Sequence, residues 1–218
     1  MSSHFAIAID GPAASGKSTL AKELAKKLGL VMVNSGAMYR AVTWKLLEDG
    51  VDLTNEDAIE TALRAMDVSC GVDGLLSTVS IDGIDPGEAL RSEEVNGKVS
   101  VVAAVAAVRD RLVGLQRNYL LSSDVVMEGR DIGTVVFPET PYKIYVDADE
   151  SVRAQRRVAV GEVDSVADRD RDDSRRKTAP LKVADGAAIL DTSNHTIESG
   201  LEAAIEILRS QGLQISGV

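Results

Sequence analysis

The 218-residue chain contains one cysteine, few aromatic residues and no long hydrophobic segment. With Cys70 as the only cysteine, no disulfide can form within the chain, which fits a reducing compartment such as the cytoplasm. The longest apolar run, "VVAAVAAV" at 101–108, is too short to cross a membrane, and the N-terminus lacks the features of a signal peptide. We therefore expect a cytoplasmic protein with no membrane partner. Aromatic residues make up 3% of the chain, so we expect a core of Val, Ile, Leu and Ala.

Basic residues are also in the minority. The chain has 24 Lys and Arg against 34 Asp and Glu, a formal net charge of −10. Such a balance disfavours binding along a nucleic-acid backbone, and we expect no nucleic-acid partner. Binding a single nucleotide needs positive charge only at the site, so this function remains open.

Short apolar runs alternate with segments of helical spacing along most of the chain. Strands are expected at 5–9, 30–33, 125–128, 142–148 and 187–191, and helices at 17–28, 36–50, 55–66, 92–121, from about 150, and from near Thr196. The alternation predicts an α/β fold with a mostly parallel sheet flanked by helices. The stretch 67–90 differs, because its alternating residues and Gly or Pro turns predict two or three short antiparallel strands.

The segment "GPAASGKS", residues 11–18, has the spacing G-x-x-x-x-G-K-S between a predicted strand and a predicted helix. In such a loop, backbone N–H groups and the helix N-terminus hold phosphates. Lys17 is expected to reach the β- and γ-phosphates of ATP, and the Ser18 hydroxyl to ligate Mg²⁺. The residues expected to hold ATP are Gly11, Pro12, Ala13, Ala14, Ser15, Gly16, Lys17, Ser18 and Thr19.

A phosphate-binding loop occurs in switch GTPases, motor ATPases and small-molecule kinases alike. The Asn-Lys-x-Asp motif of GTPases is absent from the sequence, and Glu128, at the end of "VVME", is a weak candidate for the carboxylate that serves Mg²⁺ in a motor ATPase. A small kinase needs a second pocket with basic residues. Arg40 in "SGAMYRAV" is a candidate, as are Arg130 and Asp131 in "EGRDIG". The latter two follow a strand, so we expect them near Lys17 at the carboxyl edge of the sheet.

Five segments together resemble bacterial cytidylate kinases, the CMP and dCMP kinase branch of the nucleoside monophosphate kinases. They are "IAIDGPAASGKST", "SGAMYRAV", "MEGRDIGTVVFP", "RDRDDSRR" followed by "APL", and "ILDTS". The resemblance runs nearly end to end. It implies phosphorylation of CMP and dCMP by ATP, with a P-loop kinase core, a nucleotide-binding lobe enlarged by a β insertion, and a lid.

The resemblance also implies how the chain is divided. We expect a single kinase unit, 1–218, with a core of 1–34, 101–152 and 178–218, a monophosphate-binding lobe of 35–100 with its β insertion at 67–90, and a lid of 153–177. The stretch between Arg157 and Arg169 is shorter than is usual in the family, so the lid is expected to be short. Asn34 stands where the family often has Asp. We expect a monomer.

Matching positions of the family imply the acceptor contacts. They are Ser35, Arg40, Ser100, Arg109, Arg130, Asp131, Arg169, Asp173 and Arg176. By this resemblance Arg40 and Arg130 meet the acceptor phosphate, and Asp131 lies near the cytosine amino group. Ser100 and Arg109 lie at the base edge. The arginines of the pattern Arg169, Asp173, Arg176 serve phosphates, and its aspartate serves the ribose. Lys17, Arg130, Arg169 and Arg176 form the expected catalytic group.

The chemistry of cytosine suits recognition by a carboxylate. Cytosine presents a 4-amino donor, which a carboxylate can accept, whereas uracil presents a carbonyl that a carboxylate repels. Two alternatives stay open on the sequence alone. One is a kinase for UMP or another small acceptor, and the other is a P-loop regulator that binds nucleotide but turns over slowly.

Overall fold

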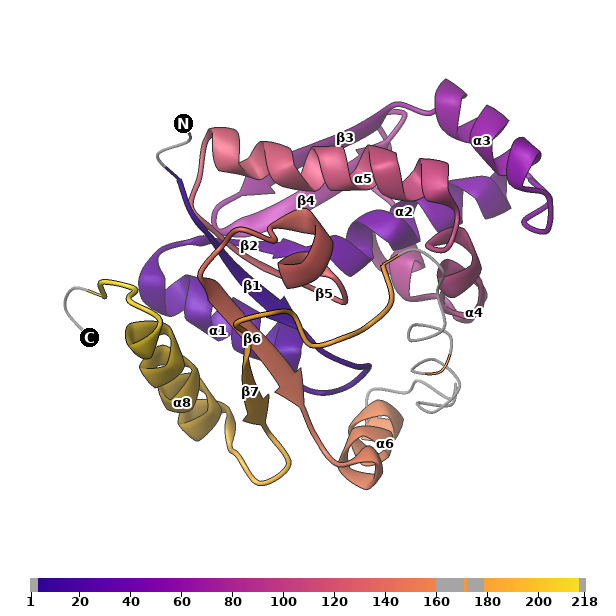
Figure 1. Ribbon diagram of the computed structural model, residues 1–218. Coiled ribbons are helices and arrows are strands. Elements are labelled where there is room, and N and C mark those ends of the chain that lie inside the picture. Colours follow the sequence, from indigo (N-terminus) through magenta and orange to yellow (C-terminus); the bar gives the residue numbers. More distant parts are fainter. Residues whose placement is uncertain (1–3, 160–170, 172–178, 216–218) are drawn as a thin grey trace.

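The computed structural model describes residues 4–159, 171 and 179–215. Within these ranges the strands form one seven-stranded sheet of order β3-β4-β2-β5-β1-β6-β7 (Figure 1). The strands are β1 (Ala6–Asp10), β2 (Val31–Asn34), β3 (Val68–Asp73), β4 (Leu76–Ile81), β5 (Val125–Gly129), β6 (Tyr142–Asp147) and β7 (Ala188–Asp191). All neighbouring pairs are parallel except β3 with β4, which confirms the predicted mostly parallel sheet.

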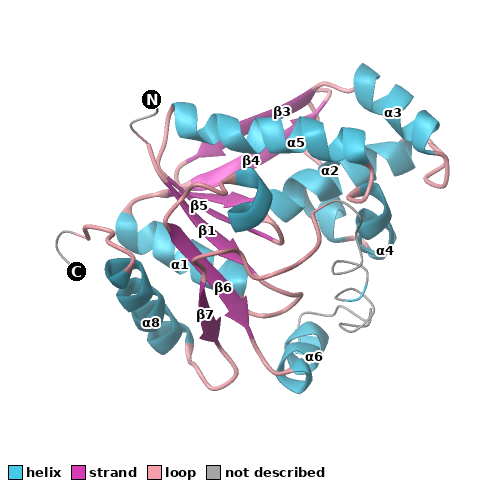
Figure 2. Cartoon of the chain, viewed as in Figure 1, coloured by secondary structure: helices cyan, strands magenta, loops and turns pink. Residues whose placement is uncertain are grey.

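Helices surround the sheet (Figure 2). They are α1 (Lys17–Leu28), α2 (Ser35–Glu48), α3 (Glu56–Ala65), α4 (Glu93–Val102), α5 (Ala106–Asn118), α6 (Glu150–Ala159) and α8 (Ile197–Ser210). Short turns of 3₁₀-helix lie at η1 (Gly87–Arg91) and η2 (Tyr119–Leu121), and η3 (Ile132–Val136) is one turn of π-helix. Most predicted boundaries are correct to within two residues.

Alternation along β1 explains how both faces of the sheet are covered. Successive side chains of a strand point to opposite faces. Ile7 and Ile9 pack with apolar residues of α1 and α8, whereas Ala6 and Ala8 pack with residues of α5 and η3. Because both faces are buried, the central strand reads as a continuous apolar run in the sequence.

The single helix predicted over 92–121 is wrong, because the chain breaks between α4 and α5. Val105 is extended (φ −71°, ψ 123°), although the run "VVAAVAAV" contains no glycine or proline to signal a break. Arg109 on α5 donates from Nη1 to the carbonyl oxygen of Ala103 at 3.2 Å. A side-chain hydrogen bond from α5 therefore satisfies a carbonyl group at the end of α4, and the apolar run does not signal it.

The hairpin β3–β4 lies in the region where antiparallel strands were predicted. It is joined to the main sheet by a parallel pairing of Met32 on β2 with Leu76 on β4. Val79 and Ile81 of β4 pack into an apolar cluster built mainly by α2, α3, α4 and α5. The hairpin thus extends the central sheet on the side that carries these four helices. The division into core, lobe and lid stays a prediction.

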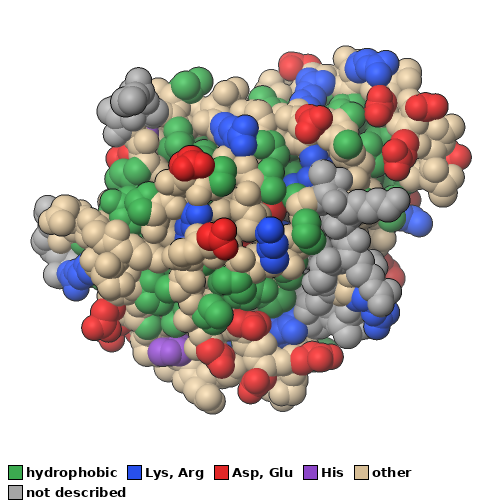
Figure 3. Space-filling model, in the orientation of Figure 1, with side chains coloured by type: hydrophobic (Ala, Val, Ile, Leu, Met, Phe, Trp, Pro, Cys, Tyr) green, Lys and Arg blue, Asp and Glu red, His purple; other side chains and the backbone are tan. Residues whose placement is uncertain are grey.

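The face of the molecule in Figure 3 shows acidic and basic side chains interspersed, with apolar side chains between them. No helix in the described ranges has both the length and the hydropathy needed to span a membrane.

Candidate active site

The loop between β1 and α1 is shaped to surround an anion. A Cβ added to Gly11 would lie 2.0 Å from the carbonyl oxygen of Val146 on β6, so only glycine allows this close approach. Gly16 has φ +89° and is the N-cap of α1, with no side chain capping the first turn. The N–H groups at this helix N-terminus therefore remain available to a phosphate. Gly11, Pro12 and Ser15 are buried in the loop, and Thr19 is exposed.

Lys17 and Ser18 begin α1 at the mouth of this loop. Lys17 is 6% exposed, and its Nζ donates to the carbonyl oxygen of Pro12 at 2.9 Å. Ser18 Oγ donates to Oε1 of Glu128 at 2.9 Å. Glu128 is buried on β5, the neighbour of β1. A hydroxyl and a carboxylate at this separation are oxygen ligands of the kind that suits Mg²⁺, so the residues present fit that ion.

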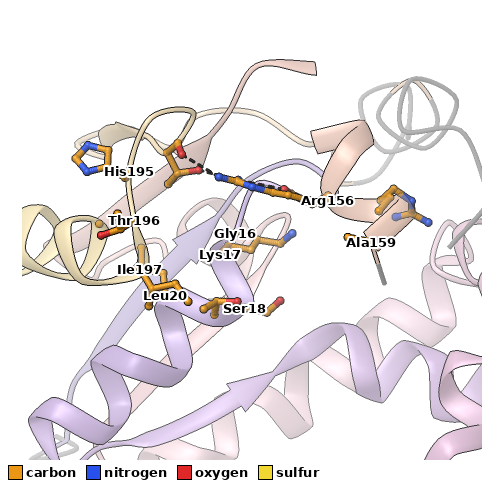
Figure 4. Close-up of a pocket in the computed structure, with 14 residues that line it drawn as sticks. Gly16, Lys17, Ser18, Leu20, Arg156, Ala159, His195, Thr196 and Ile197 are labelled. Atoms are coloured by element: carbon orange, nitrogen blue, oxygen red, sulfur yellow. Dashed lines mark hydrogen bonds between the residues drawn. The ribbon is translucent and has the colours of Figure 1, made fainter. Parts of the chain in front are cut away.

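A first cavity of about 510 Å³ opens between this loop, α6 and the start of α8 (Figure 4). Arg156 extends from α6 over the loop, and its Nη2 donates to the carbonyl oxygen of Thr192 at 2.9 Å. Thr192 Oγ1 in turn donates to the carbonyl oxygen of Ser15 at 2.8 Å. These bonds fix one wall of the cavity to the loop.

Sequence reasoning missed most of this cavity. The missed lining residues are Leu20, Arg156, Arg157, Ala159, Thr192, His195, Thr196, Ile197 and Gly200. Thr192 belongs to "ILDTS", one of the segments that carried the resemblance, so that motif was the available signal. The others come from loops and helix ends whose composition shows no pattern.

A second cavity of about 680 Å³ lies beyond Lys17 and Ser18, among α2, α4, α5 and the end of β5. The structure brings six of the predicted acceptor residues into its lining: Ser35, Arg40, Ser100, Arg109, Arg130 and Asp131. Glu88 and Arg91, on η1, also line it and were not predicted. Arg169, Asp173 and Arg176 lie outside the described residues.

A buried ion pair forms part of the wall of the second cavity. Arg109 donates from Nη2 to Oδ2 of Asp131, and the two side chains are 4% and 6% exposed. The Arg109 guanidinium also lies 5.6 Å from the centroid of the Tyr39 ring. Together with its bond to Ala103, these contacts leave Arg109 little freedom. Asp131 is therefore presented in a fixed orientation.

Gly36 and α4 determine where Arg40 lies. A Cβ on Gly36 would lie 2.8 Å from Nη1 of Arg40, so glycine leaves room for the guanidinium. Arg40 Nε donates to Oδ1 of Asn96 at 3.3 Å. Asn34 caps α2, accepting from the N–H of Ala37 at 2.9 Å. Asparagine is among the residues preferred as a helix N-cap.

The two cavities meet at one place. Lys17, Ser18 and Arg157, with the backbone around Ala14, line both of them. Arg157 is 4% exposed and comes from α6. The arrangement places two cationic side chains and a hydroxyl between two sites of nucleotide size, where a charged group can pass from one ligand to the other.

Comparison with known proteins agrees with this geometry. The family model described as cytidylate kinase matches residues 7–210. A cytidylate kinase of Streptomyces avermitilis is 39% identical, and the match covers 94% of this chain and 93% of that protein. A cytidylate kinase of Caldanaerobacter subterraneus is 42% identical, and the match covers 93% of this chain and 94% of that protein. The crystal structure of an uncharacterized protein from Eubacterium ventriosum has a TM-score of 0.50 at 13% identity, covering 95% of this chain and 99% of that one, which concerns the fold alone. The chain belongs to the cytidylate kinase family.

Proposed function

We propose that the chain transfers the γ-phosphoryl group of ATP to CMP and dCMP, giving ADP with CDP or dCDP. The observation that carries this proposal is the pair of cavities that meet at Lys17, Ser18 and Arg157. Relatives of this chain at about 40% identity are named cytidylate kinases, and the second cavity contains groups suited to a cytosine and a phosphate.

The first cavity is the proposed donor site. The loop 11–16 and the N-terminus of α1 hold the phosphates of ATP, and Lys17 exchanges its bond to Pro12 for the β- and γ-phosphates. Ser18 and Glu128 are the residues that would hold Mg²⁺. When bound, this ion neutralises phosphate charge. The base and ribose then extend toward Arg156, Thr192 and His195.

The second cavity is the proposed acceptor site. Arg40 and Arg130 are the phosphate contacts, and Ser100 and Arg109 lie at the base edge. Asp131 accepts from the cytosine amino group, and a uracil carbonyl in the same place faces a carboxylate. Specificity for cytosine follows because Asp131 is buried and held by Arg109, so it cannot turn away from the wrong base.

Catalysis in this proposal consists of positioning and of charge neutralisation. The acceptor phosphate oxygen attacks the γ-phosphorus in line, so no covalent enzyme intermediate is needed. Lys17 of α1 and Arg157 of α6 lie at the meeting point of the cavities, and Arg130 lines the second cavity. Arg169 and Arg176 complete the proposed cationic set, and closure of the lid excludes water as a competing acceptor.

The test is product analysis with ATP, Mg²⁺ and one acceptor at a time: CMP, dCMP, UMP or none. We expect CDP and dCDP, with UDP formed far more slowly and ADP without acceptor slower still. Equal rates for CMP and UMP would favour a broader kinase, and absence of any diphosphate product would favour a nucleotide-binding regulator. Size-exclusion chromatography of the same sample tests the further proposal that the enzyme is a monomer, and imaging in cells tests the proposed cytoplasmic location.

A further inference from the structure

Asp10, the last residue of β1, bonds to the turn that carries two acceptor residues. Its Oδ1 accepts from the N–H of Ile132 and its Oδ2 from the N–H of Gly133, each at 2.7 Å. These two N–H groups open η3, directly after Arg130 and Asp131. Both oxygens of one carboxylate thus hold the turn at successive residues, which fixes its orientation as well as its distance.

Chain connectivity gives this contact a second consequence. Asp10 is followed at once by Gly11, the first residue of the phosphate loop, and it pairs in register with Gly129 on β5. The carboxylate therefore joins the beginning of the donor loop to the turn of the acceptor site. The turn is also closely packed at Gly133, where an added Cβ would lie 3.1 Å from Cβ of Ala184, 3.3 Å from Oδ2 of Asp10 and 3.3 Å from Cδ of Lys143.

Asp10 is costly to bury, yet it touches neither proposed ligand. Its side chain is 3% exposed, and the described residues that line the two cavities do not include it. Burial raises the pKa of Asp10 to about 6, while hydrogen bonds from Gly133 and Ile132 lower it. A buried carboxylate is unfavourable unless it is hydrogen-bonded. The bonds to the turn satisfy this requirement, and they are the contacts that an apolar residue at this position would lose.

We propose that Asp10 is a positioning residue of the acceptor site, which holds Arg130 and Asp131 at a fixed place relative to Lys17 without contacting nucleotide. The proposal rests on the proposed function, since it assigns the turn to the acceptor. It requires that loss of the carboxylate act on use of CMP more than on use of ATP.

The matched pair of variants is Asp10→Asn and Asp124→Asn. Asp124 also accepts a backbone bond, from the N–H of Phe5 at 2.8 Å, but at the opposite end of β1. An asparagine offers one acceptor oxygen, so Asp10→Asn retains one bond to the turn and loses the other. We expect kcat/KM for CMP to fall about 10- to 100-fold, as for loss of one hydrogen bond to a charged group. The KM for ATP should stay within about 3-fold, the CMP-to-UMP ratio of kcat/KM should fall, and Asp124→Asn should match the parent in all three measurements.

Amide hydrogen exchange supplies a measurement that does not depend on activity. In Asp10→Asn the N–H groups of Ile132 and Gly133 should exchange faster than in the parent, and in Asp124→Asn they should not. If Asp10→Asn does not fold, Gly133→Ala disturbs the same contact, because the added Cβ would lie 3.3 Å from Oδ2 of Asp10, and it should show the same fall in the CMP-to-UMP ratio.

Two results would overturn the proposal: an unchanged ratio in a folded variant that alters the turn, or equal losses for ATP and CMP. A parent chain that forms no CDP would instead refute the proposed function. In that case the exchange rates of Ile132 and Gly133 still decide whether Asp10 holds the turn.

Discussion

Replacing Asp131 with asparagine tests how the proposed acceptor site recognises the base. The substitution keeps the size of the side chain and removes its charge. Asp131 is 6% exposed on its side chain and is bound by Arg109, so solvent cannot replace the lost carboxylate. The amide can donate from its NH₂ group to uracil while its oxygen keeps the bond from Arg109, or it can reverse and accept from cytosine with loss of that bond.

The magnitude follows from the two kinds of hydrogen bond. A buried polar site that leaves its partner unpaired rejects the wrong substrate by about 10⁴-fold, which is the CMP-to-UMP ratio in kcat/KM expected of the parent. In Asp131→Asn a neutral bond replaces a charge-assisted one, so kcat/KM for CMP should fall about 10- to 100-fold. The rate with UMP should rise, and the ratio should shrink to within about 10-fold. Initial rates with each acceptor at saturating ATP measure both changes.

Stability provides the control for this experiment. Removing one member of a buried ion pair costs about 3–5 kcal/mol, because the other charge is left without compensation. We expect this loss in Asp131→Asn and in Arg109→Met, and a smaller loss in the double variant than the sum of the two. Urea unfolding followed by the fluorescence of Trp44, the only tryptophan, measures all three. Additive losses, or a CMP-to-UMP ratio equal to that of the parent in a folded Asp131→Asn protein, would refute the reasoning.

Three further predictions concern the donor loop and the core beneath it. Lys17→Ala should lower kcat about 100- to 1000-fold, the loss typical of one charge-stabilising group, and near-normal turnover in a folded variant would contradict its assignment. Ser18→Ala should raise the Mg²⁺ concentration needed for half-maximal rate while leaving ATP binding without metal unchanged, because Ser18 and Glu128 are the proposed ligands; a metal titration of the initial rate decides this. Burial raises the pKa of Asp10 from 3.8 to about 6, so its contribution to stability is full below about pH 4 and is lost as the pH rises through 6. That loss is about 3 kcal/mol. Between pH 4 and pH 7 the free energy of unfolding of the parent should therefore fall by about this amount relative to that of Asp10→Asn. Equal pH dependence of the two unfolding free energies would contradict the prediction.

Local signals in the sequence were sufficient for the donor loop and the strands. The motif "GPAASGKS" places glycine where two backbone segments come close together. Gly11, which lies against the carbonyl oxygen of Val146, is such a position. The alternation of strands and helices then placed Arg130 and Asp131 at the same edge as Lys17. Ser35, Ser100 and Arg109 were predicted as acceptor contacts only through the resemblance, because no spacing rule connects them.

Other features could not be predicted because they arise from side-chain contacts that leave no pattern in the sequence. The break before α5 is accompanied by a bond from Arg109 to the carbonyl oxygen of Ala103, and the apolar run gives no sign of it. The wall of the first cavity depends on Arg156 meeting Thr192, which lies 36 residues further along the chain. Exposed residues such as Arg91 show no periodicity, so only the folded chain places this arginine beside the acceptor cavity.

The arginines of α6 explain how the donor loop keeps its shape at the base of the predicted lid. Arg153 donates from Nη1 to the carbonyl oxygen of Ala13 at 3.3 Å, and its Nε donates to the carbonyl oxygen of Ala148 at 2.9 Å. In a trans peptide the carbonyl and the next N–H point in opposite directions. A carbonyl of Ala13 held by α6 therefore turns the N–H of Ala14 away from that helix, toward the inside of the loop where a phosphate would lie. The backbone at the start of the phosphate loop is therefore held by α6, the helix from which the predicted lid extends.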